Sequence, residues 1–198
     1  WKECRDRFPN GIKEVTDYIR KKGMVPGVWL ELEVMGINCE KAKKVPDDWF
    51  FVRHGKRVYD RSRYQLDFRN PAVIEYVNEV IDRVVKEYGV GYIKMDYNIE
   101  PGIGTEIGAE SVGQGLLEHE KAYLNWLDGV FARYPDLVIE NCSSGGLRMD
   151  YALLSRYSIQ STSDQEDYRN FATIAANSPA GVTPEQAAIW SYPMRQGD

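Results

Sequence analysis

Two segments of this sequence contain acidic residues whose neighbours suit nucleophilic or acid–base chemistry. The first is Lys94-Met-Asp-Tyr-Asn98, at the end of an apolar run. In a strand, side chains alternate between the two faces, so Lys94, Asp96 and Asn98 would share one face. A lysine beside Asp96 lowers the pKa of the carboxyl and keeps it ionised, which suits a nucleophile. The same spacing also fits a structural ion pair inside a sheet, and spacing alone slightly favours that interpretation.

The second group closes the stretch Ser161-Thr-Ser-Asp-Gln-Glu-Asp167. Asp164, Glu166 and Asp167 are crowded, and because like charges repel, we expect at least one of them to hold a proton near neutral pH. A protonated carboxyl can act as a general acid. The competing interpretation is helix capping by Ser163 or Asp164. A glycosidase uses such a pair, one ionised and one protonated carboxyl group at the open end of its fold.

A third segment, Asn141-Cys-Ser-Ser-Gly-Gly146, contains mostly small residues. Small residues at a strand end allow a ligand to approach the backbone closely. Taken by itself, the segment is more typical of a tight turn before a helix.

The elements that must position these segments alternate along the chain. We expect strands over 24–32, 90–96, 137–140 and 157–161, and helices over 10–22, 70–88, 119–134, 149–156, 169–176 and 183–190. The clearest helix has Asn70 as its cap and Pro71 in first position, and Gly89 ends it. Asn10 is expected to cap the first helix. Thr183-Pro-Glu-Gln186 combines a capping box with a first-turn proline, which predicts the last helix.

Alternating strands and helices predict an α/β fold with parallel strands. A doubly wound open sheet and a (β/α)8 TIM barrel both fit this pattern. No glycine-rich phosphate loop follows a strand, which weakens the dinucleotide-binding alternative. The polar residues gather instead at the carboxyl ends of strands, where a barrel carries its chemistry. These residues are Glu31, Glu33, Asp96, Asn98, Asn141, Cys142, Ser163 and Asp164. The segment 34–70 is too long for a plain connection and is expected to be functional.

The composition narrows the class of protein. The chain of 198 residues carries a net charge of −5 without a basic cluster, which argues against nucleic acid as its partner. No apolar run reaches the ~18 residues of a membrane-spanning helix. The three cysteines are widely spaced and fit neither a disulfide framework nor a zinc site, which favours a reducing, cytoplasmic location. Because the sequence opens on Trp1 and stops at Asp198, we expect a fragment of a longer protein.

Four segments, in order, resemble glycoside hydrolase family 36, the mainly bacterial α-galactosidases. Phe8-Pro-Asn-Gly11 and Gly27-Val-Trp-Leu-Glu-Leu-Glu33 resemble the family's FPNGL and GLWFEPEM. Arg63-Tyr-Gln-Leu-Asp-Phe68 resembles a shorter RNQLVLDF. The two most specific matches are Tyr92-Ile-Lys-Met-Asp-Tyr-Asn98 with YLKWDMN, and Asn141-Cys-Ser-Ser-Gly-Gly146 plus Thr162-Ser-Asp164 with ESCSGGGGR and WTSD. The resemblance covers nearly the whole chain.

This resemblance implies a retaining exo-α-galactosidase that removes terminal galactose from oligosaccharides such as raffinose or melibiose, without a cofactor. By position in the motifs, Asp96 is the nucleophile and Asp164 the acid/base. The implied substrate-binding residues are Trp29, which stacks on the sugar, Arg63 and Lys94, which bind hydroxyls, and Cys142 and Gly145, which lie at the 2-position. The implied fold over residues 1–198 is a partial (β/α)8 barrel, roughly strands three to seven. The flanking β-sandwich and C-terminal β domain lie outside the chain, and the full-length protein is expected to be a homo-oligomer.

The chain departs from the family pattern at several positions. Leu32, Ser144 and Tyr97 replace a proline, a glycine and a methionine, and Asp164 is followed by Gln-Glu-Asp. The altered 2-position pocket leaves an α-N-acetylgalactosaminidase as an alternative. An α-galactosyl transglycosylase of the raffinose or stachyose synthase type and a non-catalytic carbohydrate-binding protein are further alternatives. Assays on nitrophenyl α-galactoside and its N-acetylgalactosamine counterpart, with product analysis in the presence of sugar acceptors, separate them.

The sequence also predicts catalysis without a metal ion. His54 and His119 are the two histidines of the chain, and neither has a partner at ligand spacing. We therefore expect hydrolysis of α-galactosides by the full-length protein to survive dialysis against EDTA, measured as the initial rate before and after treatment. A loss of activity that zinc or manganese restores would contradict this prediction.

Overall fold

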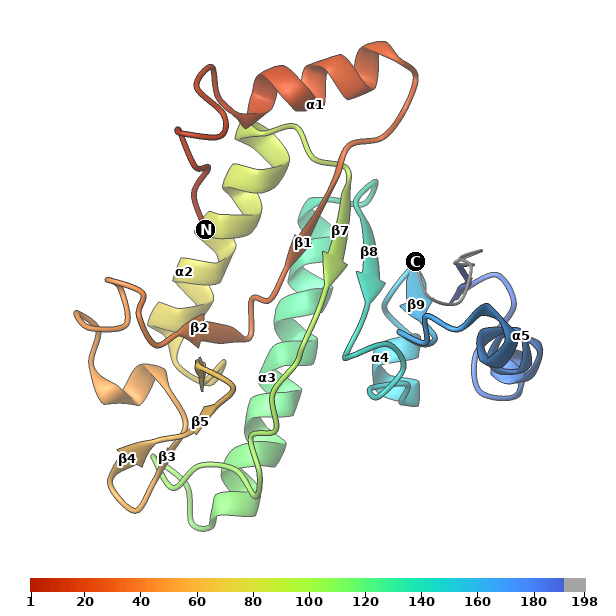
Figure 1. The fold of residues 1–198 in the computed structure, drawn as a ribbon. Helices are drawn as coiled ribbons and strands as arrows, with labels where there is room; N and C mark the ends of the chain where they lie inside the picture. The colour runs from red at the N-terminus through yellow and green to blue at the C-terminus, as the bar shows by residue number, and fades with distance from the viewer. Residues whose placement is uncertain (191–198) are drawn as a thin grey trace.

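The computed structural model describes residues 1–190 and is built around a five-stranded parallel sheet (Figure 1). Its strands, in spatial order, are β1 (Gly27–Leu30), β7 (Tyr92–Met95), β8 (Val138–Asn141), β9 (Ile159–Ser161) and β10 (Ala187–Ala188). This order follows the chain without reversal, whereas a doubly wound sheet reverses at its switch point. The predicted α/β fold with parallel strands is confirmed. Within residues 1–190, β1 and β10 each have one sheet neighbour, so the sheet does not close into a barrel.

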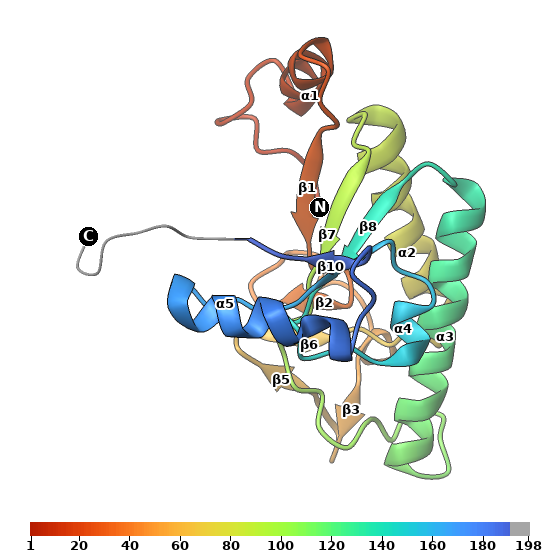
Figure 2. The ribbon, with the colours of Figure 1, turned by 90° about the vertical axis from the view of Figure 1, so that its right-hand side faces the viewer.

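Two long helices cover one face of this sheet (Figure 2). They are α2 (Pro71–Asp82), which continues as a π-helical turn over Arg83–Glu87, and α3 (Val112–Arg133). Alternate strand residues such as Ile93, Met95 and Ile139 point toward them and form the main apolar core with the buried stripes of both helices. The stripe residues are Val73, Val77, Val80 and Ile81 of α2 and Tyr123, Trp126, Leu127 and Val130 of α3. The opposite face of the sheet is thereby left for polar side chains.

The local signals at these helices act largely as the sequence predicts. The Asn70 side chain caps α2 by accepting a hydrogen bond from the Ala72 amide at 2.9 Å, and Pro71 occupies the first position. Helix α3 begins earlier than the predicted residue 119, because the Ser111 hydroxyl caps it by accepting from the Gln114 amide at 3.2 Å. The remaining helices are α1 (Ile12–Lys21), α4 (Tyr151–Leu154) and α5 (Tyr168–Asn177), with single 3-10 turns over Asp47–Trp49 and Ser178–Ala180.

The predicted cap of the first helix is wrong. Gly11 occupies the cap position of α1, and Asn10 contacts only the exposed Glu14 carboxylate. The Glu3 carboxylate instead accepts a hydrogen bond from the Ile12 amide at 2.7 Å. A residue nine positions earlier thus supplies the acceptor, a long-range contact that a local capping signal does not contain.

The predicted helix over 183–190 is also wrong. Thr183 to Gln186 form a turn, and Ala187 and Ala188 pair with Gln160 and Ser161 as strand β10. The Gln186 side chain donates to the carbonyls of Leu154 and Tyr157 at 2.7 and 3.1 Å. Pairing with β9 satisfies backbone groups that a helix would satisfy internally, so tertiary contacts override the local capping pattern.

The strand predicted over 24–32 exists, but it is shorter and less buried than expected. It lies at one edge of the sheet among the described residues, and its exposure alternates along the chain. Val28 and Leu30 pack against the core, whereas the side chain of Trp29 is 50% exposed on the other face. The apolar run therefore reflects one packed face and one aromatic residue on the open face.

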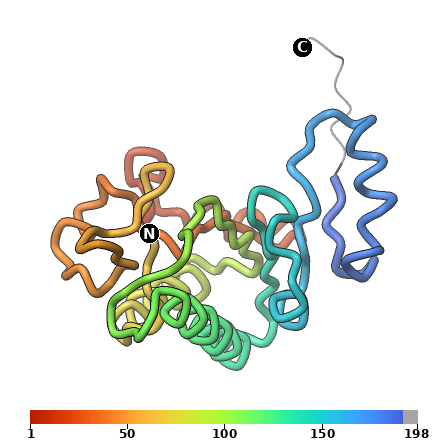
Figure 3. The backbone as a smooth tube through the Cα atoms, turned by 90° about the horizontal axis from the view of Figure 1, so that it is seen from below, coloured from red at the N-terminus to blue at the C-terminus, as the bar shows by residue number. Residues whose placement is uncertain are grey.

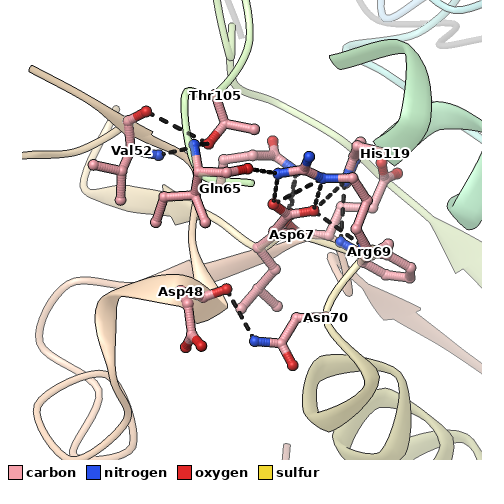
Figure 4. Close-up of polar contacts among 12 residues, drawn as sticks. Asp48, Val52, Gln65, Asp67, Arg69, Asn70, Thr105 and His119 are labelled. Atoms are coloured by element: carbon pink, nitrogen blue, oxygen red, sulfur yellow. Dashed lines mark hydrogen bonds and ion pairs between the residues drawn. The ribbon is translucent and has the colours of Figure 1, made fainter. Parts of the chain in front are cut away.

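The long segment 34–70 forms a small structure of its own, on the side of the molecule opposite residues 159–190 (Figure 3). Strands β2 (Val34–Gly36), β6 (Arg63–Gln65) and β5 (Tyr59–Asp60) make an antiparallel sheet, and β3 (Val52–Arg53) pairs with β4 (Lys56–Arg57). Buried polar contacts order its end and fasten it to α3 (Figure 4). Asp67 pairs with Arg69 at 2.6 Å within the segment, and the Phe68 amide donates to Nδ1 of His119 in α3 at 3.0 Å.

The two asparagines offer a matched test of the capping assignments. Asn70→Ala removes an observed cap of α2 and should lower the free energy of unfolding by about 1 kcal/mol. Asn10→Ala removes an exposed contact and should change it by less than about 0.5 kcal/mol. Urea denaturation of the full-length protein, followed by circular dichroism, measures both. Equal losses for the two variants would contradict the assignment.

Candidate active site

Asp96 lies at the carboxyl end of β7 and is the most highly connected carboxylate of the site. Its Oδ2 accepts a hydrogen bond from the Trp29 indole at 2.9 Å, and its Oδ1 accepts one from the Tyr97 amide at 2.9 Å. Trp29 comes from the neighbouring strand β1, where it is in register with Lys94. The contact between Trp29 and Asp96 therefore depends on parallel pairing of two strands that are far apart in the sequence.

These contacts determine the charge of Asp96. Burial by itself would raise the pKa of Asp96, but hydrogen bonds from Asn98, Trp29, Cys142 and the Tyr97 amide outweigh it and hold the pKa below its usual value. The sequence predicts an ionised Asp96, and the structure agrees, but the cause differs. Lys94 lies 3.1 Å from Glu140 on strand β8, so its ion-pair partner is Glu140.

The loop after β8 lies between the two catalytic candidates. Cys142 follows the strand directly, and its amide donates to the Met95 carbonyl at 2.9 Å. Burial raises the pKa of Cys142 to about 11, and the neighbouring Asp96 charge adds to the rise, so its thiol is neutral at physiological pH. Gly145 has a φ of +82° and packs on the next segment: a β-carbon there would lie 2.7 Å from the Asp164 nitrogen. Gly145 is thus required for close approach of this loop to Asp164.

Asp164 follows β9 and is exposed at the same edge of the sheet. It does not cap helix α5, because Asp167 does so by accepting from the Arg169 amide at 2.8 Å. Ser163 instead accepts from the Gln165 amide at 3.0 Å in a local turn. The carboxyl group of Asp164 therefore remains available at the mouth of the site.

Lys94 connects the two sides of the site. Its ammonium lies over the Trp190 ring, 4.2 Å from the ring centroid, and close enough to Asp164 to be affected by its charge. Burial by itself would lower the pKa of Lys94, but its interactions with Glu140, and the charge of Asp164, raise it above the usual value. The Trp190 indole also donates to the Ser163 carbonyl at 3.1 Å. Lys94 is therefore a fixed cation beside the acid/base candidate.

A chain of hydrogen bonds joins the remaining predicted residue, Arg63, to this site. Arg63 Nε donates to Glu31 at 2.7 Å, and Glu31 also accepts from Asn98 Nδ2 at 2.8 Å. The side-chain Oδ1 of Asn98 accepts hydrogen bonds from the backbone amide and the hydroxyl of Ser144, at 3.0 and 2.7 Å. Ser144, which stands where the family has glycine, adopts a left-handed φ of +42°. This series of hydrogen bonds thus links the carboxyl ends of β1, β7 and β8.

The structure thereby brings the predicted site residues together at the carboxyl end of the parallel sheet, which Arg63 reaches from β6 of the antiparallel sheet through its contact with Glu31. It also adds residues that the sequence did not single out as site residues: Glu140 and Trp190 beside Lys94, and Glu31 and Asn98 beside Arg63 and Asp96. Glu31 and Asn98 could have been included, since both were recognised as polar groups at strand ends. Glu140 could have been recognised as a charged residue within an apolar strand, a pattern that requires a buried partner. Nothing in the sequence around Trp190 indicated that it lies at the site.

Among residues 1–190, no cluster of histidine, cysteine, aspartate and glutamate side chains has the geometry to hold a metal ion. His119 is buried between the rings of Phe51 and Phe68 and accepts a backbone hydrogen bond, which is a structural role. In the same described range, the helices all lack the length and apolar character needed to cross a bilayer.

Residues 1–186 match the sequence profile of the melibiase family. The chain belongs to the melibiase family. Two of its relatives are α-galactosidase AgaA of Geobacillus stearothermophilus, 30% identical over 172 residues, and α-galactosidase Mel36A of Lactobacillus acidophilus, 28% identical over 152 residues. These alignments cover 84% and 76% of this chain but 23% and 21% of the relatives. The chain thus spans about a quarter of the length of the curated relatives it matches.

Solved structures of the family agree in fold. The crystal structure of the GH36 α-galactosidase AgaA superposes on the whole of this chain with a TM-score of 0.87 and 24% identity, over 28% of its own length. AgaB of the same organism gives a TM-score of 0.85 at 25% identity, over 99% of the chain and 28% of its own. The recognition of glycoside hydrolase family 36 from the sequence motifs is therefore confirmed.

The indole donor of Trp29 gives a test of the electrostatics at Asp96. Trp29→Phe removes a hydrogen bond to the charged carboxylate, so the pKa of Asp96 should rise. With Asp96 as the predicted nucleophile, which must be ionised, activity is expected to fall as pH drops through this pKa, so the acidic limb of kcat/KM against pH should move to higher pH. The profile is measured on the full-length enzyme with nitrophenyl α-galactoside.

Trp126→Phe is the matched control. It removes an indole that donates to Asn78 between α2 and α3, away from Asp96. The acidic limb should stay in place in this variant. An unchanged limb in Trp29→Phe would show that the indole does not stabilise the charged carboxylate.

Proposed function

We propose that the full-length protein containing this chain is a retaining exo-α-galactosidase acting on oligosaccharides such as raffinose or melibiose. The observation that carries the proposal is the ionised Asp96, held by neutral donors and separated from the exposed Asp164 by the Cys142–Gly145 loop. Two carboxyl groups in different environments at one sheet edge match the requirements of glycoside hydrolysis. The names of the relatives support it, and a variant of AgaA has been solved with raffinose.

The mechanism we propose has two displacements. An Asp96 oxygen attacks the anomeric carbon from the β face while Asp164 donates its proton to the glycosidic oxygen, so the carbon–oxygen bond breaks and the aglycone leaves. Asp164 then takes a proton from water, the water oxygen attacks the same carbon from the α face, and Asp96 leaves as the carboxylate. Galactose is released in the α configuration. In both steps, Asp96 provides the nucleophile or leaving group, and Asp164 gives or takes the proton.

The other site residues bind the sugar in this proposal. The exposed face of Trp29 packs on the apolar face of galactose, and the Lys94 ammonium and the Arg63 guanidinium donate to its hydroxyls. The Cys142 thiol and the Gly145 backbone lie at the 2-position, where the close packing of Gly145 against Asp164 favours a hydroxyl over the larger acetamido group. The sugar site is completed by residues that lie outside this chain.

We further propose that the five parallel strands are strands three to seven of a (β/α)8 barrel. Their sequential order supports this, as does the grouping of polar residues at the strand carboxyl ends. In that architecture the unpaired edges of β1 and β10 adjoin barrel strands from the rest of the protein, with a β-sandwich and a C-terminal β domain flanking the barrel. A homo-oligomeric assembly and a cytoplasmic location complete the proposal.

The roles of the two carboxylates can be separated by mutation of the full-length enzyme. Asp96→Ala should abolish turnover of every substrate, since no group remains to attack the anomeric carbon. Asp164→Ala removes the proton donor, so its residual activity should be highest on dinitrophenyl galactoside or galactosyl fluoride, whose leaving groups need no proton. Added azide should then trap the galactosyl-enzyme as α-galactosyl azide, identified by NMR.

Asp136→Ala is the control, because Asp136 is exposed before β8, at the opposite end of the strands. It should retain normal turnover. Azide rescue of Asp96→Ala with β-galactosyl azide as product, together with an inactive Asp164→Ala, would reverse the two roles.

A further inference from the structure

An oppositely charged pair is buried behind the loop that carries Cys142 and Gly145. Arg148 Nη1 lies 2.7 Å from Glu33 Oε1, and the two side chains are 15% and 3% exposed. Glu33 follows β1, whereas Arg148 ends the loop after β8, so the pair joins segments that are 115 positions apart. Burial by itself would lower the pKa of Arg148, but the charge of Glu33 raises it, so the guanidinium is permanently charged.

Aromatic rings fix the plane of the guanidinium. Its central carbon lies 4.4 Å from the centroid of the Tyr97 ring and 5.5 Å from that of Tyr123. Tyr97 follows Asp96 directly, and its hydroxyl donates to Gln65 Oε1 at 2.6 Å, which holds the ring in place. Arg148 therefore rests on the residue whose amide binds the Asp96 carboxylate.

The same arginine fixes the course of the loop. The Arg148 carbonyl accepts from Asn141 Nδ2 at 2.9 Å, and the Leu147 amide donates to the Ser143 carbonyl at 3.1 Å. The Ser143 hydroxyl donates in turn to the Tyr97 carbonyl at 2.7 Å. The loop over 142–148 is thus held against Tyr97 at two points, by Ser143 near its start and by Arg148 at its end.

The Arg148–Glu33 pair is expected to fix the position of the loop more than it stabilises the folded state. Transfer of two charges from water costs about as much as their attraction returns, and a hydrophobic pair of similar volume is often as stable. Within residues 1–190, Arg148 Nη2 is buried without a hydrogen-bond partner, which adds a further cost. A guanidinium that is paired with one fixed carboxylate and packed on aromatic rings defines distance and orientation better than an apolar contact does.

The other acidic groups near Arg148 do not replace Glu33. Glu120 and Asp150 line a cavity of about 430 Å³ together with Arg148 and Tyr97. Burial raises the pKa of Glu120, and the charge of Glu33 raises it further, whereas it is Glu33 that lies within ion-pair distance of Arg148, at 2.7 Å. Asp150 caps α4 by accepting from the Leu153 amide at 3.0 Å. Glu33 is therefore the anionic partner that orients the guanidinium.

We propose that Arg148, anchored by Glu33, is a positioning residue that fixes Cys142 and Gly145 relative to Asp96 and Asp164. This inference rests on the proposed function, because it assigns the loop to the 2-position of the bound galactose. Arg148 does not touch the substrate itself. It acts through the loop in front of it and through Tyr97 beside it.

The test compares two substrates on the full-length enzyme: nitrophenyl α-galactoside and its 2-deoxy analogue. In Arg148→Met, the preference for the 2-hydroxyl, measured as the ratio of the two kcat/KM values, should fall about tenfold, because the loop no longer holds its contacts at the 2-position. Arg148→Lys should restore the ratio to within about threefold of wild type. Glu33→Gln, which keeps the side-chain volume, should shift the ratio in the same direction and serves where Arg148→Met does not fold.

Arg156→Met is the matched control. It removes an arginine of the same segment whose partner, Asp128, lies at 2.8 Å on the outer surface. This variant should keep the wild-type ratio. If Arg148→Met and Glu33→Gln lower both kcat/KM values by the same factor, the pair is merely structural and the inference is overturned.

A second measurement does not depend on activity. Cys142 is buried at the start of the loop, so its alkylation by iodoacetamide reports loop opening, while the exposed Cys4 and Cys39 calibrate the reagent. Peptide mapping should show alkylation of Cys142 at least about tenfold faster in Arg148→Met, and near the wild-type rate in Arg148→Lys and Arg156→Met. Unchanged protection of Cys142 in Arg148→Met and Glu33→Gln would overturn the inference. An inactive wild-type enzyme on both galactosides would overturn the proposed function alone, since the alkylation rates still decide the role of Arg148.

Discussion

In-register parallel pairing of β1, β7 and β8 is the constraint on which the rest of this structure depends. The pairing sets Trp29 beside Lys94 and Lys94 beside Glu140 on one face of the sheet. The same alternation directs Ile93 and Met95 toward α2 and α3 on the other face. A slip of one residue in β7 would bury Lys94 in the apolar core and move Asp96 away from the Trp29 indole, so the core and the site are specified together.

The electrostatics of Asp96 follow from this arrangement. The groups that hold it ionised are neutral donors, the Trp29 indole and the Tyr97 amide among them, whereas the nearby cation Lys94 is paired with Glu140. In the mechanism proposed above, Asp96 forms an ester with the sugar and loses its charge during the reaction. Neutral donors lose less interaction energy at that step than a salt bridge would, because hydrogen bonds to a neutral oxygen remain possible. The pairing of Lys94 with Glu140 therefore also serves Asp96.

The apolar core and the ion pairs between distant segments have different effects on this structure. The core of β7, β8, α2 and α3 supplies the stability, since hydrophobic burial is the main favourable term in folding. The pairs Arg63–Glu31, Lys94–Glu140 and Arg148–Glu33 each join different elements at the carboxyl edge of the sheet. Their net contribution to stability is small, but each fixes a direction and a distance that apolar contacts leave loose.

The sequence by itself determined the α/β class, the course of α2 with its Asn70 cap, and the carboxylates at strand ends, because periodicity, capping residues and motif spacing are local properties. Only the tertiary structure decided which partners these residues take. It paired Lys94 with Glu140, not Asp96, gave the start of α1 to Glu3, and turned the predicted helix over 183–190 into strand β10. Each of these outcomes depends on contacts between segments that are distant in the chain, and a local pattern carries no information about which distant group will complete a hydrogen bond or share a buried charge.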